Sequence, residues 1–353
     1  TMARKRERRL RRRIKAAVLS VAVLYICSSF ISDDRFFRNL MWRFEIEPSK
    51  AATKNGKPIM HTFFSRIDPE VTTKNTGMSD EADAMMLATW KQAWEDAGWE
   101  TKVLTIEDAM EHSNFHYFNT TLREFKYGKK FREYDVLCFF RWLALAMSGG
   151  GWSCDYDVFP LNPIVGGAET LPNDGMFTAY ETIPRAAVPS FVSGTKEEYN
   201  RMSHLLVSNA AVHQDKEEFW TDFFSLIDVH VIDPDSYYIE DAVVPGQVVL
   251  TGKRYSQEDC DRITSGKMGA HFSHSAIFNG VTEEGETMED RPKIALRFLK
   301  MWKEQCTNDM PFTPAALVPP EPEPVESNTT AEEEPSEHID LVDNLAASAS
   351  ERR

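Results

Sequence analysis

The stretch FFRWLALAMSGGGWSCDYDVF, residues Phe139–Phe159, decides how the rest of this chain is interpreted. Its first half carries apolar residues at helical spacing, the glycines at 149–151 end that helix, and a short strand follows. Glycine permits a positive φ and places no side chain between the backbone and whatever lies across the turn. The pattern predicts a helix, a tight glycine turn and a strand, in that order.

Asp155 and Asp157 close this predicted strand. On an extended chain, residues two positions apart point to the same face, roughly 6.6 Å apart at the backbone. Paired carboxylates of this kind suit a hard divalent cation that keeps positions for water and substrate phosphates. The pair therefore predicts a metal site at the carboxyl end of a core element, where α/β folds build ligand sites. Two further Asp-x-Asp pairs, which we interpret as turn or solvated side chains, are Asp233/Asp235 and Asp259/Asp261.

The same stretch resembles the signature of the DXD sugar-binding-region glycosyltransferases, family 32, which include Golgi α-1,6-mannosyltransferases. The positions that fit are Arg141, Trp142, Gly149, Gly150 or Gly151, Trp152, Asp155 and Asp157. Cys138 stands where the family has an Asp, with Asp135 nearby, and one extra residue separates the glycines from the first Asp. The resemblance implies a GT-A-like fold, a GDP- or UDP-sugar donor, a glycan acceptor, Mn²⁺ or Mg²⁺, and retention at the anomeric carbon.

Residues outside the stretch are also candidates for the site, and the resemblance supplies the roles of Asn209 and the histidine. Asn209 lies in a Ser-Asn-Ala run like the family's, where it would bind the donor; a turn or capping asparagine is the alternative. Glu181 ends a predicted strand and is a candidate catalytic carboxylate, or else a solvated one. His271 or His274, before Ser275, resembles the family's closing histidine, although its Trp is missing, and we favour His271. It would complete the metal shell, or else be an ordinary buried histidine.

The predicted site therefore has three overlapping groups. The expected catalytic residues are Asp155, Asp157 and Glu181. The expected donor-binding residues are Arg141, Asp155, Gly150, Gly151 and Asn209. The expected metal ligands are Asp155, Asp157 and His271.

Strands and helices are predicted to alternate through the body of the chain. Strands at 58–64 and 101–104 flank a helix capped by Ser79 that runs to about residue 97, and the 132–148 helix follows. This order is typical of an α/β domain with a mostly parallel central sheet. A final helix over 293–305 would carry Arg297, Lys300 and Lys303 on its outer face, and we assign them no role.

The beginning of the chain predicts a membrane anchor. Residues 1–15 hold nine Lys or Arg against one acid, and the seventeen residues 16–32 carry no charge. This order favours a type II signal anchor with a cytoplasmic basic arm, a stem over 33–56 and a lumenal body in the Golgi or ER. A cleaved signal peptide is the alternative, and an Arg-rich transit peptide is a weaker one.

The rest of the chain is acidic. The formal net charge is −15 overall and about −23 once the basic arm is set aside, which argues against nucleic-acid binding. Residues 57–311 are long enough for one large domain, and 312–353, rich in Pro and acids, are expected to be disordered. Four cysteines lie in the body of the chain: Cys138, Cys154, Cys260 and Cys306. In an oxidising lumen two outcomes stay open for them, either one or two disulfides, with three possible full pairings, or reduced thiols.

These observations together predict a metal-dependent hexosyltransferase that uses a nucleotide sugar. A non-catalytic, lumenal carbohydrate-binding or scaffold protein on the same fold is the alternative, which Cys138 encourages. A metal-dependent hydrolase is a third interpretation, although hydrolytic carboxylate pairs usually face each other from separate elements.

Overall fold

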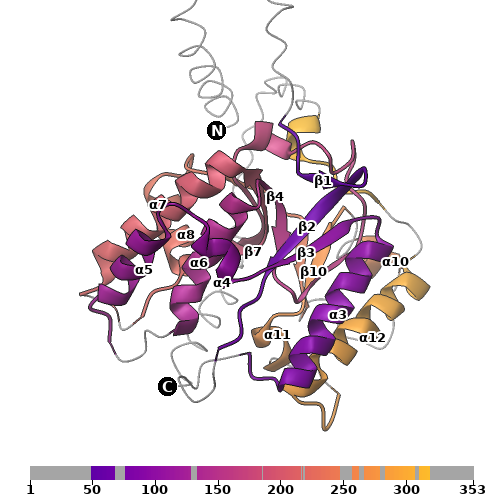
Figure 1. The fold of residues 1–353 in the computed structure, drawn as a ribbon. Coiled ribbons are helices and arrows are strands. Elements are labelled where there is room, and N and C mark those ends of the chain that lie inside the picture. The colour runs from indigo at the N-terminus through magenta and orange to yellow at the C-terminus, as the bar shows by residue number, and fades with distance from the viewer. Residues whose placement is uncertain are drawn as a thin grey trace, which may run out of the picture. The chain divides into compact units, whose positions relative to one another are not determined.

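The computed structural model describes residues 49–67, 76–128, 133–184, 186–215, 217, 219–246, 257–261, 266–278, 283–306 and 310–318. All but Ser49 belong to a compact unit that begins at Lys50 (Figure 1). The predicted basic arm and membrane anchor lie outside the described residues. Within the described part of the chain, no helix is long and apolar enough to cross a membrane.

Helices and strands alternate along this unit, which confirms the α/β class. The strands are β1 (Thr53–Lys54), β2 (Lys57–Phe63), β3 (Glu100–Leu104), β4 (Gly150–Cys154), β5 (Val158–Pro160), β6 (Thr178–Ile183), β7 (Ala186–Thr195), β8 (Tyr238–Ile239), β9 (Val243–Pro245) and β10 (Gly269–His271). The helices are α3 (Asp80–Asp96), α4 (Ile106–Met110), α5 (Phe115–Glu124), α6 (Glu133–Met147), α7 (Lys196–His213), α8 (Asp222–Ile232), α10 (Gln257–Asp259), α11 (His274–Phe278) and α12 (Arg291–Gln305). Short 3₁₀ turns are η2 (Pro172–Gly175), η4 (Met288–Asp290) and η5 (Ala315–Leu317).

The central sheet is mixed rather than mostly parallel. Its strand order is β1-β2-β4-β7-β6-β8, with β3 also paired to β2. Strand β2 runs parallel to β3 and β4, but β7 runs antiparallel to both β4 and β6. The reason is a short connection between β6 and β7, which has no room for the helical crossover that a parallel pair needs. A second, three-stranded sheet has the order β5-β10-β9.

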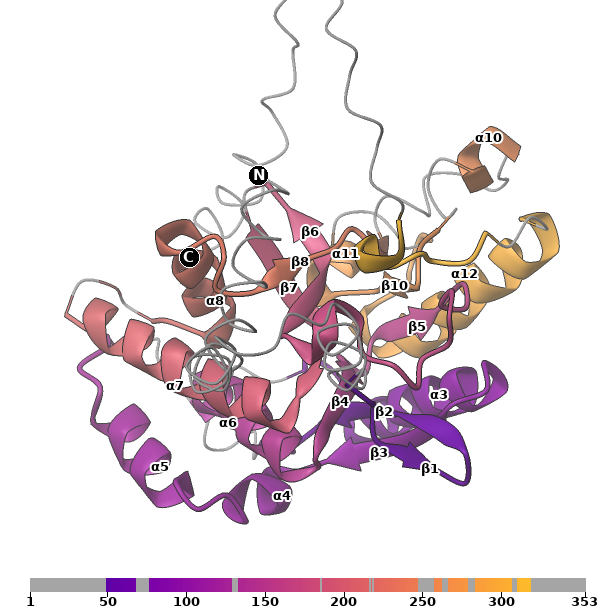
Figure 2. The same cartoon turned by 90° about the horizontal axis from the view of Figure 1, so that it is seen from above.

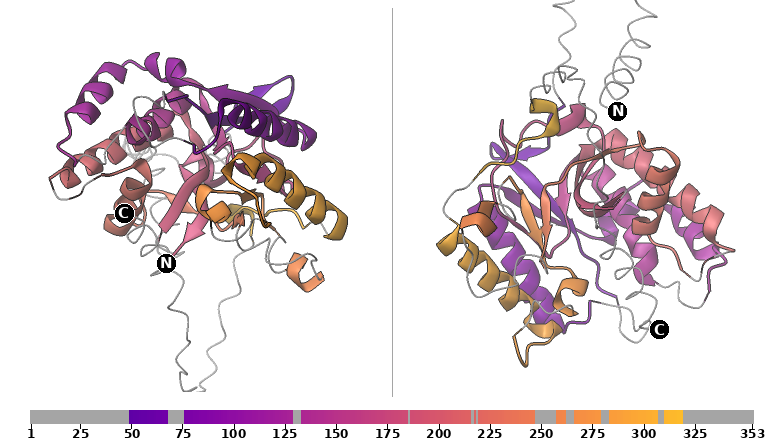
Figure 3. Two further views of the ribbon diagram at one scale, coloured as in Figure 1. Left: turned by 90° about the horizontal axis from the view of Figure 1, so that it is seen from below. Right: turned by 180° about the vertical axis from the view of Figure 1, so that it is seen from behind.

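The central sheet separates two hydrophobic cores, because successive side chains of a strand point to opposite faces. In β6, Tyr180 packs in one core and Ala179 in the other; in β7, Phe191 and Val192 divide in the same way. Helices α4–α8 cover one face, whereas α3, α12 and the small sheet cover the other (Figures 1 and 2). Helices α3 and α12 lie side by side in every view (Figure 3).

The two helices that bracket the predicted site begin and end close to where the sequence indicated. Ser79 caps α3 and its hydroxyl accepts a hydrogen bond from the Ala82 backbone N–H. Helix α6 ends at Met147, before three glycines with φ values of 97°, 77° and 110°. Helix α7, in contrast, was missed, because its polar face made residues near Asn209 resemble a turn.

The compact unit extends beyond both predicted domain boundaries. Lys50 forms an antiparallel bridge with Thr170, so residues assigned to the stem join the fold. At the other end, Phe312 bridges Ile164 and is only 5% exposed. Apolar burial of this kind holds the start of the predicted disordered tail against the domain, and the described chain continues to Val318. The rest of that tail lies outside the described residues.

One disulfide joins Cys260 to Cys306, the residue that follows α12. Cys154 is buried on β4 and Cys138 is partly buried on α6, and neither forms a disulfide with another described cysteine. The structure therefore selects one bridge from the pairings that the sequence left open. A disulfide of this kind is typical of proteins that fold in an oxidising compartment.

We expect His61, buried in the middle of β2, to make stability depend on pH. Burial lowers the pKa of His61 to about 4 from 6.5, although the ring Nδ1–H donates to the Trp152 carbonyl oxygen at 2.9 Å. Between the folded pKa of about 4 and the unfolded value of 6.5, the unfolded chain binds a proton at His61 and the folded chain does not. The contribution of His61 to stability is therefore complete above the unfolded pKa and is lost as the pH falls. Urea titrations should show a loss of about 2 kcal/mol from this residue between pH 7 and pH 5.

The His61→Gln variant is the matched comparison, because glutamine keeps a donor but does not titrate in this range. Its pH dependence should be shallower than that of the unmodified chain by the same amount. Parallel pH profiles for the two proteins would refute the assignment.

The glycine turn predicts a contrast between two neighbouring substitutions. A Cβ at Gly150 would lie 2.4 Å from the Lys196 backbone nitrogen, whereas a Cβ at Gly149 would meet nothing within 4 Å. We expect Gly149→Ala to cost about 1 kcal/mol, from its positive φ alone, and Gly150→Ala to cost about 3 kcal/mol or more. Thermal unfolding of both variants measures the difference, and equal midpoints would contradict it.

Candidate active site

A cavity of about 440 Å³ opens where the parallel strands β2 and β4 end. We call it the DXD cavity. It is lined by Phe63, Phe64, Ser65, Arg66, Ile67, Thr76, Met78, Asp83, Tyr134, Leu137, Cys138, Arg141, Asp155, Tyr156, Asp157, His271, Ser273, His274, Ser275 and Arg291. The carboxyl ends of parallel strands are where α/β folds place ligand sites, because strand order changes there and leaves a crevice. Here the change is the step from parallel β2 to antiparallel β7 on either side of β4.

The two aspartates lie on a tight turn rather than on an extended strand. The Val158 backbone N–H donates to the Asp155 carbonyl oxygen at 3.0 Å, which closes the turn between β4 and β5. The expectation of an extended Asp-x-Asp was therefore wrong in its geometry. Both carboxylates still line the DXD cavity, because a turn of this kind brings residues two positions apart together above the sheet edge.

Arg141 holds the first aspartate. Its Nη1–H donates to Asp155 Oδ1 at 2.9 Å, and its Nε–H donates to Asp222 Oδ2 at 2.6 Å. Asp222 is 1% exposed and also accepts from the indole N–H of Trp142 at 2.8 Å. Two donors therefore fix the Asp222 carboxylate, and this carboxylate fixes the guanidinium that reaches Asp155.

Arg291 and His271 hold the second aspartate. Arg291 is 3% exposed; it donates to Asp157 Oδ2 and, through Nε, to the Phe272 carbonyl oxygen at 2.8 Å. His271 Nε2 lies 3.4 Å from the other oxygen, Asp157 Oδ1. That oxygen is buried and has no hydrogen-bond partner among the described residues. Asp157 thus has one oxygen in an ion pair and the other directed at the imidazole edge.

Glu181 sets the orientation of His271. His271 Nδ1–H donates to Glu181 Oε2 at 2.6 Å, and the same carboxylate oxygen accepts from the Ser190 hydroxyl. Both Glu181 and His271 are buried. Glu181 does not line the DXD cavity, so in this structure it supports the histidine and does not face a substrate. A carboxylate behind a histidine fixes the ring and its tautomer.

The two aspartates differ in their acidity. Partial burial raises the pKa of Asp155 above its ordinary value, against the opposing effect of Arg141. Burial also opposes ionisation of Asp157, but Arg291 and His271 outweigh it and lower its pKa to about 2. Burial likewise opposes charge on His271, yet Glu181 and Asp157 raise its pKa well above the ordinary value. A site that separates the pKa values of paired carboxyls is typical of functional sites.

A divalent cation fits these residues. Asp155, Asp157 and His271 each offer a ligand atom, and the three atoms lie within 4.8 Å of one another. Two carboxylates and one imidazole form a donor set for Mn²⁺ or a similar ion, and the unsatisfied Asp157 Oδ1 supplies a buried negative oxygen for it. A bound metal would compete with the proton on His271, since only a neutral imidazole coordinates.

Three of the predicted donor-binding residues lie away from the DXD cavity. Gly150 and Gly151 are buried on β4, where Gly150 packs against the backbone at Thr195 and Lys196. Asn209 lies on α7, where its side-chain N–H donates to Asp228 Oδ2 at 2.5 Å. Gly150 therefore serves the close approach of two backbones. Asn209 joins two helices from within α7, which is neither a cap nor a turn position.

Arg291 and Asp222 were missed by sequence reasoning. Each begins a helix, α12 or α8, far along the chain from the aspartates. The final helix was predicted to begin after Arg291, and the sequence assigned no role to Asp222. The sequence contained one signal for each residue, a charge beside an otherwise apolar helix face. This signal alone does not identify the residue with which the charge pairs.

The metal group predicts distinct effects for two histidines that line the same cavity. We expect His271→Ala to abolish Mn²⁺ binding, since it removes one ligand, and His274→Ala to leave it nearly unchanged. Glu181→Gln should weaken Mn²⁺ binding by about 10- to 100-fold, because the carboxylate behind the ligand is lost. Electron paramagnetic resonance of free Mn²⁺ measures all three affinities, and equal values for the two histidine variants would argue against the group.

A comparison with protein-family models gives one match. The model of a domain of unknown function, DUF8765, matches residues 53–167. The match includes Arg141, Asp155 and Asp157 but neither Glu181 nor His271, and its description names no activity. No curated protein has significant sequence similarity to this chain.

Proposed function

We propose that this chain is a metal-dependent glycosyltransferase. It transfers a hexose from a GDP- or UDP-sugar to a hydroxyl group of a glycan, with retention at the anomeric carbon, on a GT-A-like fold. The observation that carries the proposal is the buried Asp157. Its Oδ1 has no hydrogen bond among the described residues and lies 3.4 Å from His271 Nε2, and Asp157 lines the same cavity as Asp155. This arrangement suits a cation that must also hold a diphosphate.

The residues around the aspartates would have different roles in such a reaction. A divalent ion, Mn²⁺ or Mg²⁺, held by Asp155, Asp157 and His271, would supply Lewis acidity to the leaving diphosphate. Arg141 and Arg291 lie beside the two carboxylates and add positive charge where negative charge develops. Glu181 keeps His271 oriented. The aromatic pair Phe64 and Tyr156, whose ring centroids lie 5.5 Å apart, offers an apolar wall to a base or sugar.

The proposal also places the protein in the secretory pathway. The basic arm and uncharged run at residues 1–32 favour a single-pass type II protein of the Golgi or ER with its catalytic domain in the lumen. The Cys260–Cys306 disulfide supports an oxidising compartment. The acidic body argues against a nucleic-acid partner.

The alternative is a carbohydrate-binding or scaffold protein on the same fold. One observation favours it: both aspartates already pair with arginines, Asp155 with Arg141 and Asp157 with Arg291. Guanidinium groups neutralise carboxylates and so reduce their attraction for a divalent ion. Under this alternative the cavity binds a sugar without transferring it.

Calorimetric titration with GDP and UDP, each with and without Mn²⁺, tests the proposal. We expect one nucleotide to bind at least ten times more tightly with the metal, because the ion bridges its phosphates to the aspartates. The Asp157→Ala variant should lose this metal-dependent gain. Binding of neither nucleotide to the folded protein would refute the proposal and favour the alternative.

Asp235→Ala is the matched control, since it alters another Asp-x-Asp pair that lies in an exposed turn after α8. It should bind the nucleotide and the metal as the unmodified chain does. A loss in Asp235→Ala as large as that in Asp157→Ala would show that general acidity, and not the site, governs the metal effect.

A further inference from the structure

Two Asn-Thr-Thr sequences occur in the chain, at residues 119–121 and 328–330. Each has the form of an N-glycosylation acceptor, an asparagine followed two positions later by a hydroxyl residue. The first lies in helix α5, and the second lies outside the described residues. A folded protein can carry a bulky glycan on an asparagine only at its surface. The surroundings of Asn119 in α5 therefore decide whether the first sequence can be glycosylated.

Helix α5 turns one face to the protein and the other to solvent. Its buried side chains are Phe118 and Leu122, one turn apart, whereas Tyr117 is 60% exposed. Asn119 is partly exposed and Thr120 is exposed. Figures 1 and 2 both show α5 at the outer edge of the helices that cover this face of the central sheet. A glycan on Asn119 would therefore extend into solvent.

The side-chain amide of Asn119 is held by its oxygen. Arg123, one turn later, donates from Nε to Asn119 Oδ1 at 2.8 Å, and its two terminal nitrogens donate to the Glu133 carboxylate at 2.7 Å. Among the described residues, Asn119 Nδ2 has no hydrogen-bond acceptor. N-glycosylation changes Nδ2 and leaves Oδ1 as an acceptor, so the bond from Arg123 is compatible with the modified side chain.

The position of α5 also keeps such a glycan away from the candidate active site. Among the described residues that line the DXD cavity, none belongs to α5. The Cys260–Cys306 disulfide indicates an oxidising compartment, and the lumen where N-glycosylation takes place is of this kind. A glycan on Asn119 is therefore compatible both with an open DXD cavity and with the compartment that the disulfide indicates.

We propose that Asn119 carries an N-linked oligosaccharide. The inference rests on the lumenal location that accompanies the proposed function. The donor is an oligosaccharide on a lipid diphosphate. The bond between sugar C1 and the diphosphate oxygen breaks, a bond between C1 and Asn119 Nδ2 forms, and the released lipid diphosphate takes up the amide proton.

Expression of the full chain in cells with an N-glycosylating secretory pathway tests this inference. The background variant is Asn328→Gln, which removes the second sequence. Peptide N-glycosidase F should shift this protein to a faster-migrating band and convert Asn119 to aspartate, which peptide mass spectrometry detects. Asn119→Gln in the same background should migrate with the digested protein, both before and after digestion.

Two neighbouring threonines provide the matched control. The acceptor sequence requires the hydroxyl residue at position 121 and accepts any residue except proline at position 120. We expect Thr121→Ala to lose the shift completely, whereas Thr121→Ser and Thr120→Ala should keep it. Equal loss of the shift in Thr120→Ala and Thr121→Ala would contradict the assignment of Asn119.

The disulfide reports the compartment independently of the glycan. Alkylation of the cellular protein before reduction shows whether Cys260 and Cys306 are joined. An unmodified Asn119 in a chain that contains the disulfide would overturn the inference and leave the lumenal location and the proposed function in place. An unmodified Asn119 in a chain with reduced cysteines would overturn the inference together with the lumenal location. Nucleotide titration of the DXD cavity tests the proposed function separately in either case.

Discussion

The buried ion pair between Arg291 and Asp157 is the interaction on which the DXD cavity depends. Both side chains are almost fully withdrawn from water, and desolvating two charges costs several kcal/mol per ion unless further hydrogen bonds satisfy them. Here the Phe272 carbonyl oxygen accepts a second donor of the guanidinium, and the His271 imidazole approaches the second oxygen of the carboxylate. The pair ties the first residue of α12 to the turn between β4 and β5, so the last helix of the chain fixes the position of an aspartate that lies 134 residues earlier.

Arg141 and Asp222 form a second ion pair on the other side of the turn. Helix α6 supplies the guanidinium, helix α8 supplies the carboxylate, and Asp155 is the outer member of the chain of charges. Asp155 stays 37% exposed, whereas Asp157 and Asp222 are buried. From this difference we infer two roles. The ion pairs Arg291–Asp157 and Arg141–Asp222 hold the turn in place, and Asp155 remains accessible to water, metal or ligand.

Much of this arrangement was predictable because it rests on local sequence. The cap at Ser79, the glycine stop after α6 and the approach of both aspartates to a sheet edge all follow from short-range rules. The mixture of parallel and antiparallel strands in the sheet was harder to predict, since it depends on how β6 and β7 connect. Arg291 and Asp222 could not be assigned, because a charged residue at a helix start is usually solvated, and only tertiary packing shows that these two are buried. The donor-binding roles expected of Gly150, Gly151 and Asn209 came from the resemblance. In this structure Gly150 lets two backbones approach closely, Gly151 is buried on β4, and the Asn209 side chain bonds to a neighbouring helix.

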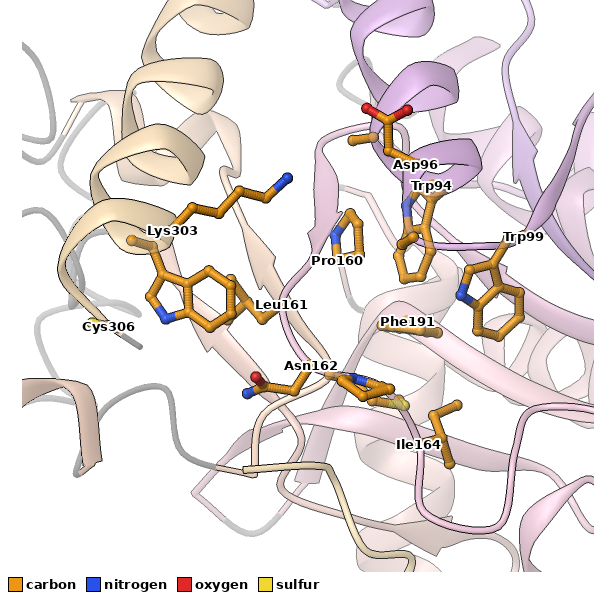
Figure 4. A pocket seen from close by; sticks show the side chains of 15 residues that line it. Trp94, Asp96, Trp99, Pro160, Leu161, Asn162, Ile164, Phe191, Lys303 and Cys306 are labelled. Atoms are coloured by element: carbon orange, nitrogen blue, oxygen red, sulfur yellow. The ribbon is translucent and has the colours of Figure 1, made fainter. Parts of the chain in front are cut away.

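The α3–α12 pair runs from the DXD cavity to a second cavity of about 620 Å³ (Figure 4), and the two cavities differ in their lining. At the first end, the helix starts carry Asp83 and Arg291, and the lining is rich in charge. At the second end, tryptophans close the layer between the helices and the sheet, and charge is confined to Asp96 and Lys303. Charged groups need ion-pair partners when they are buried, whereas an indole needs only one acceptor, which the Val158 carbonyl oxygen supplies to Trp94 at 3.0 Å. The same two helices therefore end in ion pairs on one side and in aromatic packing on the other, and the Cys260–Cys306 bridge fixes the end of α12 beside the aromatic packing.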